Sequence, residues 1–68
     1  MANREALSEL IYSNGKTYSS CAKELNMSAN TFTKIMNGNR KLHEDEIDTL
    51  IDFLNITNND VKVSIFLH

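Results

Sequence analysis

Polar side chains that could read nucleic-acid bases lie between residues 28 and 37, in a segment with helical spacing of its apolar residues. Phe32 and Ile35 are three residues apart, which places both on the inner side of a helix. The side chains that then face outward are those of Asn30, Thr33 and Lys34. An asparagine amide can pair bidentately with adenine, and a lysine ammonium can reach guanine acceptors or a phosphate. An ordinary solvated helix face has the same residue types. The choice between a base-reading face and a solvated face therefore depends on what precedes this helix.

A second set of residues could hold a phosphate backbone. Free amides and hydroxyls at the start of a helix bind phosphate, and basic or amide side chains in a loop can grip the same backbone. The candidates at helix starts are Thr17, Tyr18, Ser19 and Ser28, and those at and after the end of the second short helix are Asn37, Asn39, Arg40 and Lys41. Either basic residue of the loop could instead enter a minor groove. Helix capping and solubility explain the same residues equally well, and both interpretations stay open.

The chain shows no credible catalytic set and no metal site. Cys21 lies on the side of its helix that packs, and His43 stands at a helix start among acids, so we expect a core thiol and an N-cap. Three consecutive carboxylates follow at residues 44–46, but consecutive residues on a helix splay to different sides. We therefore expect no enzyme, no cofactor, no metal and no small-molecule substrate.

The outward residues are positioned by a segment, 18–38, that has the pattern of two short helices joined by a turn. Ala22 is small where two helices must approach closely, and Asn26 stands at the turn, where a residue able to take positive φ is needed. Ser28 can cap the second helix. The apolar positions that would bury one side of each helix are Cys21, Leu25, Met27, Phe32 and Ile35. A unit of this kind carries its second helix into the major groove of DNA.

Turn residues divide the rest of the chain into further helices. Asn14-Gly15, Gly38 and Asn55 are typical of helix ends. The predicted helices cover about residues 2–13, 18–25, 28–37 and 43–54. The last stretch is ambiguous, because Val61 and Val63 alternate with polar residues as in a strand, whereas capping by Thr57 or Asn58 favours a helix. We favour a short helix from about residue 58, with an end that could be extended.

Length and composition limit the class of protein. Sixty-eight residues make a single domain, 1–68, near the small end for independent folding. There is no proline and there are two glycines, which fits an all-α domain. The single cysteine cannot form an internal disulfide. Because we see no signal peptide and no stretch long enough to span a bilayer, we expect no membrane association and a cytoplasmic location.

Charge is unevenly distributed along the chain. The net charge is −2, although DNA-binding domains are usually basic. Residues 1–42 carry six basic and three acidic side chains, for +3, whereas residues 43–68 carry one basic and six acidic side chains, for −5. A basic front and an acidic back would orient the domain on a phosphate backbone, and the acidic back could equally bind a protein.

The run from Thr17 to Thr57 resembles the DNA-binding domain of phage repressors, Cro proteins and many bacterial regulators. Its helix-turn-helix aligns without a gap, Gly38 falls where the family ends its recognition helix, and the apolar residues of 47–54 align with the family's fourth helix. The resemblance implies a compact, all-α, lambda-repressor-like fold of four to five helices. It also implies that Ala29, Asn30 and Lys34 approach base edges, with Thr33 nearby. Alanine at 29, where a polar side chain is common, restricts readout there to apolar contact.

The resemblance implies a regulator that binds double-stranded operator DNA, Cro-like or a small repressor of a temperate phage or prophage. A homodimer on a two-fold site is expected. The apolar tail, Ile65, Phe66 and Leu67, must be buried against the core or a second chain, and we take it as the dimer interface. The alternative function is a protein-binding module of the same fold, an antirepressor or modulator that grips a partner repressor. An antitoxin is a third possibility that no residue supports.

Overall fold

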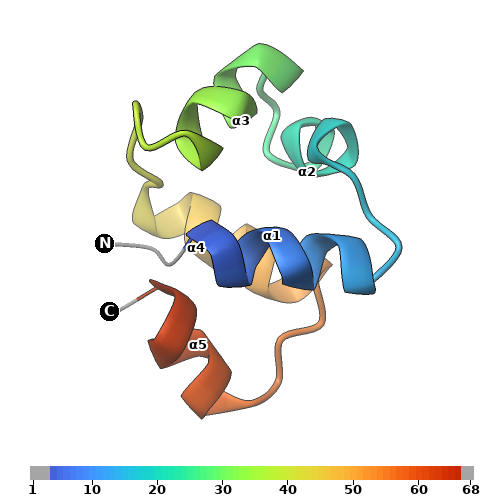
Figure 1. Cartoon of the computed structure of the whole chain (residues 1–68), viewed down its shortest axis with the longest axis vertical. Coiled ribbons are helices and arrows are strands. Elements are labelled where there is room, and N and C mark those ends of the chain that lie inside the picture. Colours follow the sequence, from blue (N-terminus) through green and yellow to red (C-terminus); the bar gives the residue numbers. More distant parts are fainter. Residues whose placement is uncertain (1–3, 67–68) are drawn as a thin grey trace.

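In the computed structural model, which describes residues 4–66, the chain forms five helices and no strand (Figure 1). The helices are α1 (Arg4–Ser13), α2 (Tyr18–Glu24), α3 (Ala29–Met36), α4 (Glu44–Phe53) and α5 (Asn59–Phe66). The prediction of an all-α chain is confirmed, and the helix ends differ from the predicted ones by a residue or two. The alternating stretch after Asn58 is a helix and not a strand. The predicted start of the first helix at residue 2 lies outside the described residues.

The first four helices end in the same way, with a residue in the left-handed conformation after the cap. After α2, the Asn26 N–H donates to the Lys23 carbonyl over 3.1 Å, and the Met27 N–H donates to the Ala22 carbonyl over 3.0 Å. This pair of bonds is the Schellman motif, which satisfies carbonyls that the helix leaves free. The same pair recurs after α1, α3 and α4. The four left-handed residues are Gly15, Gly38 and Asn55, predicted as helix ends, and Asn26, predicted as the turn residue with positive φ.

The turn between α2 and α3 should tolerate glycine at Asn26 and resist a β-branched residue. Asn26 has φ of 56°, a conformation that costs most L-residues about 1–2 kcal/mol. We expect Asn26→Val to lower the free energy of unfolding by about that amount, and Asn26→Gly to stay within a few tenths of a kcal/mol of the parent. Thermal unfolding followed by circular dichroism compares the three chains. Equal melting temperatures for the glycine and valine variants would contradict the prediction.

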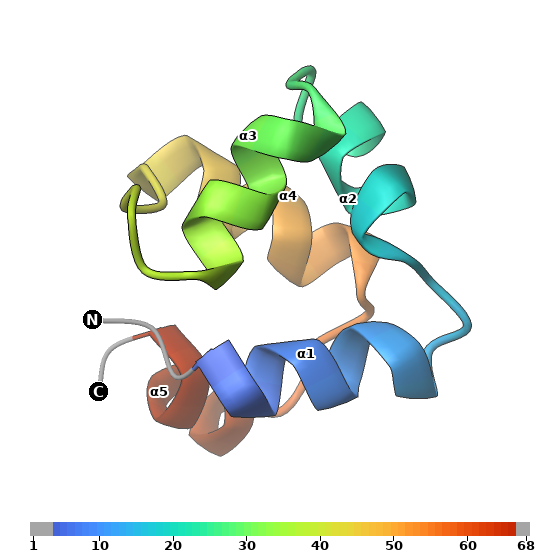
Figure 2. The same cartoon turned by 45° about the horizontal axis from the view of Figure 1, so that its top comes forward.

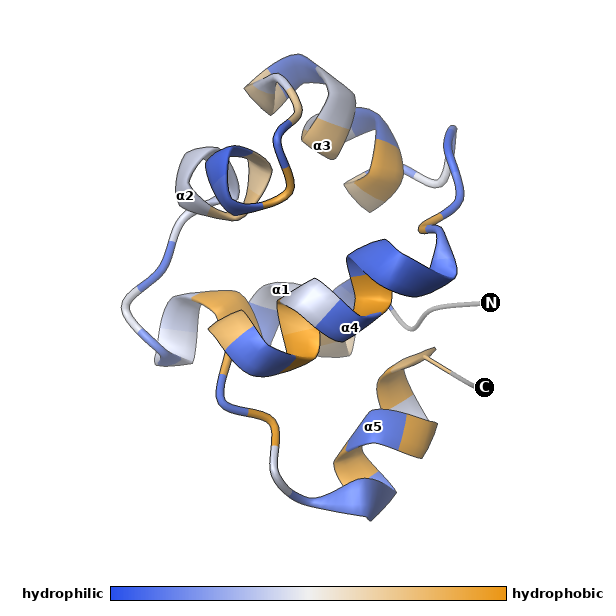
Figure 3. Ribbon diagram, turned by 180° about the vertical axis from the view of Figure 1, so that it is seen from behind, coloured by the Kyte–Doolittle hydropathy of each residue, from blue (hydrophilic) through white to orange (hydrophobic). Residues whose placement is uncertain are grey.

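A single cluster of buried apolar residues joins all five helices, whose arrangement is seen from a second direction in Figure 2. Figure 3 shows that every helix carries apolar segments, in orange. Cys21 and Ala22 are buried on α2, which packs against α3 and α4, so the small side chains stand where helices approach closely. The largest fully buried side chains are those of Phe32, Leu7, Ile11, Leu50, Leu54 and Cys21. The buried position of Cys21 confirms the predicted core thiol.

The end of α5 is buried against the core, which is one of the two outcomes expected for the apolar tail. Ile65 and Phe66 are only 2% and 6% exposed and belong to the core cluster. The core of the same chain covers these two side chains, so they do not form a free surface. Leu67, the third predicted interface residue, lies outside the described residues. Replacing Phe66 with an acidic residue would bury an unpaired carboxylate. Such a variant would therefore report on folding and not on association.

The layout separates α3 from α5. In both Figure 1 and Figure 2 these helices lie at opposite ends of the molecule, and α1 and α4 lie between them in Figure 1. The longest dimension of the molecule is 29 Å. Along residues 4–66, every helix is too short or too polar to cross a bilayer.

Candidate nucleic-acid interface

The start of α2 is held by two side chains that cap each other. Thr17 Oγ1 accepts from the Ser20 N–H over 3.1 Å, and Ser20 Oγ accepts from the Thr17 N–H over 2.9 Å. This reciprocal arrangement is a capping box, and it confirms Thr17 as the predicted N-cap. The hydroxyl oxygen of Thr17 is engaged, but its hydrogen can still donate to a phosphate. Ser19 is exposed beside it.

Tyr18 has a structural position that the sequence did not reveal. Its hydroxyl shares a 3.1 Å hydrogen bond with Ser8 Oγ of α1. Its ring stacks on Tyr12 with centroids 5.8 Å apart, and meets Phe32 edge-on at 5.5 Å. Tyr18 therefore joins α1, α2 and α3, and its side chain is half-buried. The predicted phosphate contact at Tyr18 stays a prediction, and its backbone amide at the helix start is also placed for it.

The helix α3 presents the side that was predicted to face outward. Ser28 Oγ accepts from the Thr31 N–H over 3.1 Å and caps the helix as predicted. Phe32 and Ile35 are buried. The four predicted base-contacting residues, Ala29, Asn30, Thr33 and Lys34, are all exposed. The inner face of α3 is therefore fixed in the core, while the outer face remains available.

Two of the four outward side chains are uncommitted. Thr33 Oγ1 donates to the Ala29 carbonyl over 2.9 Å, so this hydroxyl is directed back to its own helix. Within residues 4–66, the side chains of Asn30 and Lys34 form no hydrogen bond or ion pair. They offer one amide and one ammonium to a ligand, and no protein partner has to be displaced.

The loop after α3 holds a bidentate ion pair that neutralises one of its cations. Arg40 Nη1 and Nη2 donate to the two carboxylate oxygens of Glu46 over 3.1 and 3.0 Å. Glu46 Oε1 also accepts from the N–H of His43, the N-cap residue of α4, over 2.8 Å. Arg40 was predicted to contact phosphate, but here it ties the loop to α4. The other predicted contacts around it, Asn37, Asn39 and Lys41, are exposed.

The sequence did not reveal a further cation at the end of α3. Arg4 of α1 lies against Gly38, and a Cβ at that glycine would come within 2.7 Å of Arg4 Nη1. Arg4, Arg40 and Lys41 line one pocket of about 320 Å³ whose apolar walls include Leu7 and Phe66. Gly38 thus allows both the left-handed conformation at the end of α3 and the close approach of Arg4. The two residues are 34 positions apart in the chain, so no local sequence pattern indicates their contact.

The Arg40–Glu46 pair should make stability depend on acid. The hydrogen bond from Arg40 lowers the pKa of Glu46 below its ordinary value. A carboxyl whose pKa is lower in the folded state than in the unfolded state stabilises the fold at pH values above its unfolded pKa. That stabilisation is lost as the pH falls through the folded-state pKa. We expect Glu46→Gln to reduce the free energy of unfolding at pH 7 by about 1–3 kcal/mol, and the difference to shrink progressively below about pH 4. Urea unfolding across a pH series measures it.

The matched control is Glu44→Gln, an exposed carboxylate in the first turn of the same helix. It should cost only a few tenths of a kcal/mol, through the helix dipole. A deficit of Glu46→Gln that stays constant from neutral to acid pH would contradict the prediction, as would an equal deficit for the control.

Cys21 lies in the core. Burial raises the pKa of the Cys21 thiol, against an opposing effect of Lys16, so the thiol stays protonated in the core. Among residues 4–66 no group of three or more histidine, cysteine or acidic side chains is placed to hold a metal ion.

The site is therefore an exposed helix face with one amide and one ammonium, set beside a capped helix start and a loop that carries Lys41 and the neutralised Arg40. No protein-family model, curated protein or solved structure matches this chain.

Proposed function

We propose that this chain is a sequence-specific, DNA-binding transcriptional regulator that places α3 in the major groove of operator DNA. The observation that carries the proposal is the outer face of α3, where Asn30 and Lys34 are exposed and uncommitted. They stand on a helix that α2 and a left-handed turn hold against the core. This is the geometry with which a helix-turn-helix presents base-reading side chains.

The remaining predicted residues would supply affinity and not sequence choice. The start of α2, with Thr17 and Ser19, and the exposed loop residues, with Lys41, would contact phosphates on either side of the groove. Arg4 adds a cation beside the end of α3 that could join them. Arg40 contributes less charge than its type suggests, because Glu46 neutralises it.

The most specific form of the proposal is a Cro-like protein or small repressor of a temperate phage or prophage, acting in the cytoplasm. It would bind a two-fold operator as a homodimer and occlude a promoter. The lambda-repressor-like fold belongs to this proposal, supported by five helices in which α2 and α3 pack closely. No cofactor is required.

Selection of duplexes from a random-sequence pool tests the proposal. We expect an enriched duplex with two related half-sites, which competes better than a shuffled duplex of equal composition. If no duplex is enriched over the starting pool, the proposal fails.

The second candidate function is a protein-binding module, an antirepressor or modulator of a partner repressor. It is favoured by the charge of −5 over residues 43–68, by the apolar Ala29 on the outer face of α3, and by the neutralised Arg40. A chain that enriches no duplex, but binds a repressor through α3, would support it.

A further inference from the structure

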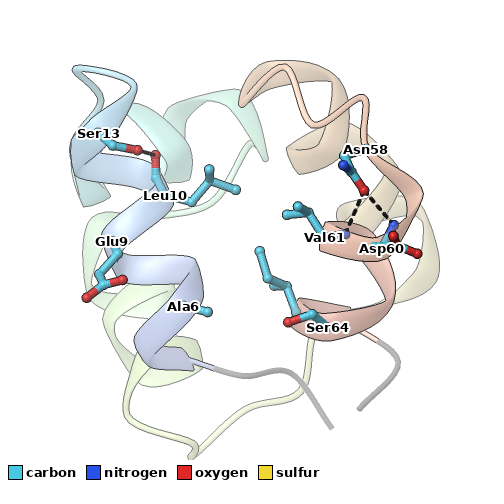
Figure 4. Close-up of a pocket in the computed structure, with 9 residues that line it drawn as sticks. Ala6, Glu9, Leu10, Ser13, Asn58, Asp60, Val61 and Ser64 are labelled. Carbon is cyan, nitrogen blue, oxygen red and sulfur yellow. Dashed lines mark hydrogen bonds between the residues drawn. The ribbon is translucent and has the colours of Figure 1, made fainter.

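An open apolar groove lies between α1 and α5, with a volume of about 460 Å³ (Figure 4). Figure 4 shows Leu10 and Ala6 of α1 directed toward Val61 and Ser64 of α5 across the gap. Ile65, which is buried, also lines it. The two helices thus present apolar side chains to each other without closing on them.

The last turn of α5 is more deeply buried than its first turn. Ile65 and Phe66 bury the last turn of the helix, whereas Val61, one turn earlier, remains 36% exposed. Ala6 and Ser64 are small residues at the positions that would otherwise fill the space. A side chain from outside the described structure could therefore enter between α1 and α5 without displacing a core residue.

Charge on the groove has one sign. Its charged lining residues are Glu9 and Asp60, and none of its lining residues in the described range is basic. Neither carboxylate forms an ion pair within residues 4–66. Two of the other polar lining residues are satisfied locally: Ser13 Oγ donates to the Leu10 carbonyl, and Asn58 Oδ1 accepts from two amides at the start of α5. Two carboxylates without an ion pair, beside an apolar floor, are complementary to a ligand that is both cationic and apolar.

We propose that this groove is a docking site for a cationic amphipathic helix of a partner protein, with apolar side chains between α1 and α5 and lysines or arginines beside Glu9 and Asp60. Helices recognise grooves of this kind with an apolar stripe of i, i+3, i+4 and i+7 residues. Nucleic acid is a poor occupant, because the carboxylates repel a polyanion. The site lies at the end of the molecule opposite α3, so it leaves the proposed DNA-binding face free.

A second copy of the chain fits the groove less well than a cationic partner. A two-fold contact places the same patch of each copy against the other. The carboxylates of Glu9 and Asp60 from both copies would then share one apolar, poorly solvated contact, where like charges repel. The occupant is therefore a different segment that brings positive charge.

The test is a titration of the isotopically labelled protein with two peptides of about 14 residues, roughly four helical turns. One has a leucine stripe flanked by lysines, and the other has the same stripe flanked by glutamates. We expect the lysine peptide to shift the amide resonances of α1 and α5 saturably, and the glutamate peptide to bind at least about tenfold more weakly. Glu9→Gln and Asp60→Asn should each weaken binding of the lysine peptide about two- to fivefold.

Matched variants separate the groove from general acidity. Asp48→Asn removes an exposed carboxylate of α4 outside the groove and should leave peptide binding unchanged. Ser64→Leu places a larger side chain in the groove from an exposed position. It should abolish binding of the lysine peptide and leave the melting temperature of the protein unchanged. Four results would overturn the proposal: shifts that map to the acidic face of α4, equal binding of both peptides, an equal effect of Asp48→Asn, or concentration-dependent shifts at α1 and α5 without any peptide. The last would assign the groove to a second copy.

Discussion

Replacing Phe32 with alanine is expected to remove a large part of the free energy of unfolding. The Phe32 side chain is fully buried on the inner face of α3 and meets the Tyr18 ring edge-on. Removing a buried phenylalanine costs about 3–5 kcal/mol. A chain of this length has a total stability of only about 3–10 kcal/mol, so the loss is comparable to the whole. Thermal unfolding followed by circular dichroism should show a melting temperature lower by more than about 12 °C, or no cooperative transition.

Thr33→Ala, at the next position of the same helix, is the matched control. Thr33 is exposed and its hydroxyl bonds only to its own helix, so its removal should change the free energy of unfolding by no more than about 0.5 kcal/mol. If Phe32→Ala melts within a few degrees of the parent, the inner face of α3 is not packed as described. The outward direction of Asn30 and Lys34 would then be wrong as well.

The second large effect is expected at Lys34, on the outer face of α3. If its ammonium reaches a guanine, Lys34→Ala should weaken binding to the enriched duplex by about 1–3 kcal/mol, and should relax sequence preference at one base pair. If it reaches a phosphate, the loss should be uniform across sequences, and the salt dependence should fall by about one counterion. Fluorescence anisotropy with the enriched and shuffled duplexes distinguishes the two contacts.

Lys62→Ala makes the same change of charge on α5, at the opposite end of the molecule. It should alter affinity much less than Lys34→Ala. Equal losses for the two variants would mean that only net charge matters, and that α3 does not face the DNA.

The parts of the structure that the sequence predicted are those set by local chemistry. Gly15, Gly38 and Asn55 were identified as helix ends, and Asn26 as the turn residue, because few residues adopt positive φ, and all four do so. The outward side of α3 followed from the spacing of its apolar residues. In both cases the physical cause lies within a few residues of chain, so the sequence carries the full signal.

The parts that were missed depend on segments distant in sequence. Arg40 was assigned to phosphate because nothing in its loop showed that Glu46, on the next helix, would receive both of its guanidinium nitrogens. Tyr18 was assigned to phosphate without knowledge of Ser8 on α1. For the apolar tail the sequence left burial in the core and burial in a second chain open, and the core buries Ile65 and Phe66. In each case the sequence did not show the contact that the side chain makes within its own chain.

The pairing of Arg40 with Glu46 reduces the charge available for the proposed DNA binding, while the outer face of α3 stays exposed. With Arg40 neutralised and Tyr18 bonded to α1, affinity would depend on Lys34, Lys41 and backbone amides. We therefore expect modest affinity for each domain, which makes a two-fold operator and a dimer more important. Because Ile65 and Phe66 are buried, contact between the two domains has to use a surface other than the end of α5.

The most direct test of DNA reading by α3 is the affinity for the enriched and the shuffled duplex across a salt series, from about 50 to 200 mM. Counterion release predicts that log Kd rises linearly with log salt for both duplexes. The enriched duplex should bind more tightly at every salt concentration, and this margin should shrink in Lys34→Ala but not in Lys62→Ala. If both duplexes bind equally even at the lowest salt, or if neither binds, α3 does not read DNA and the protein-binding alternative holds.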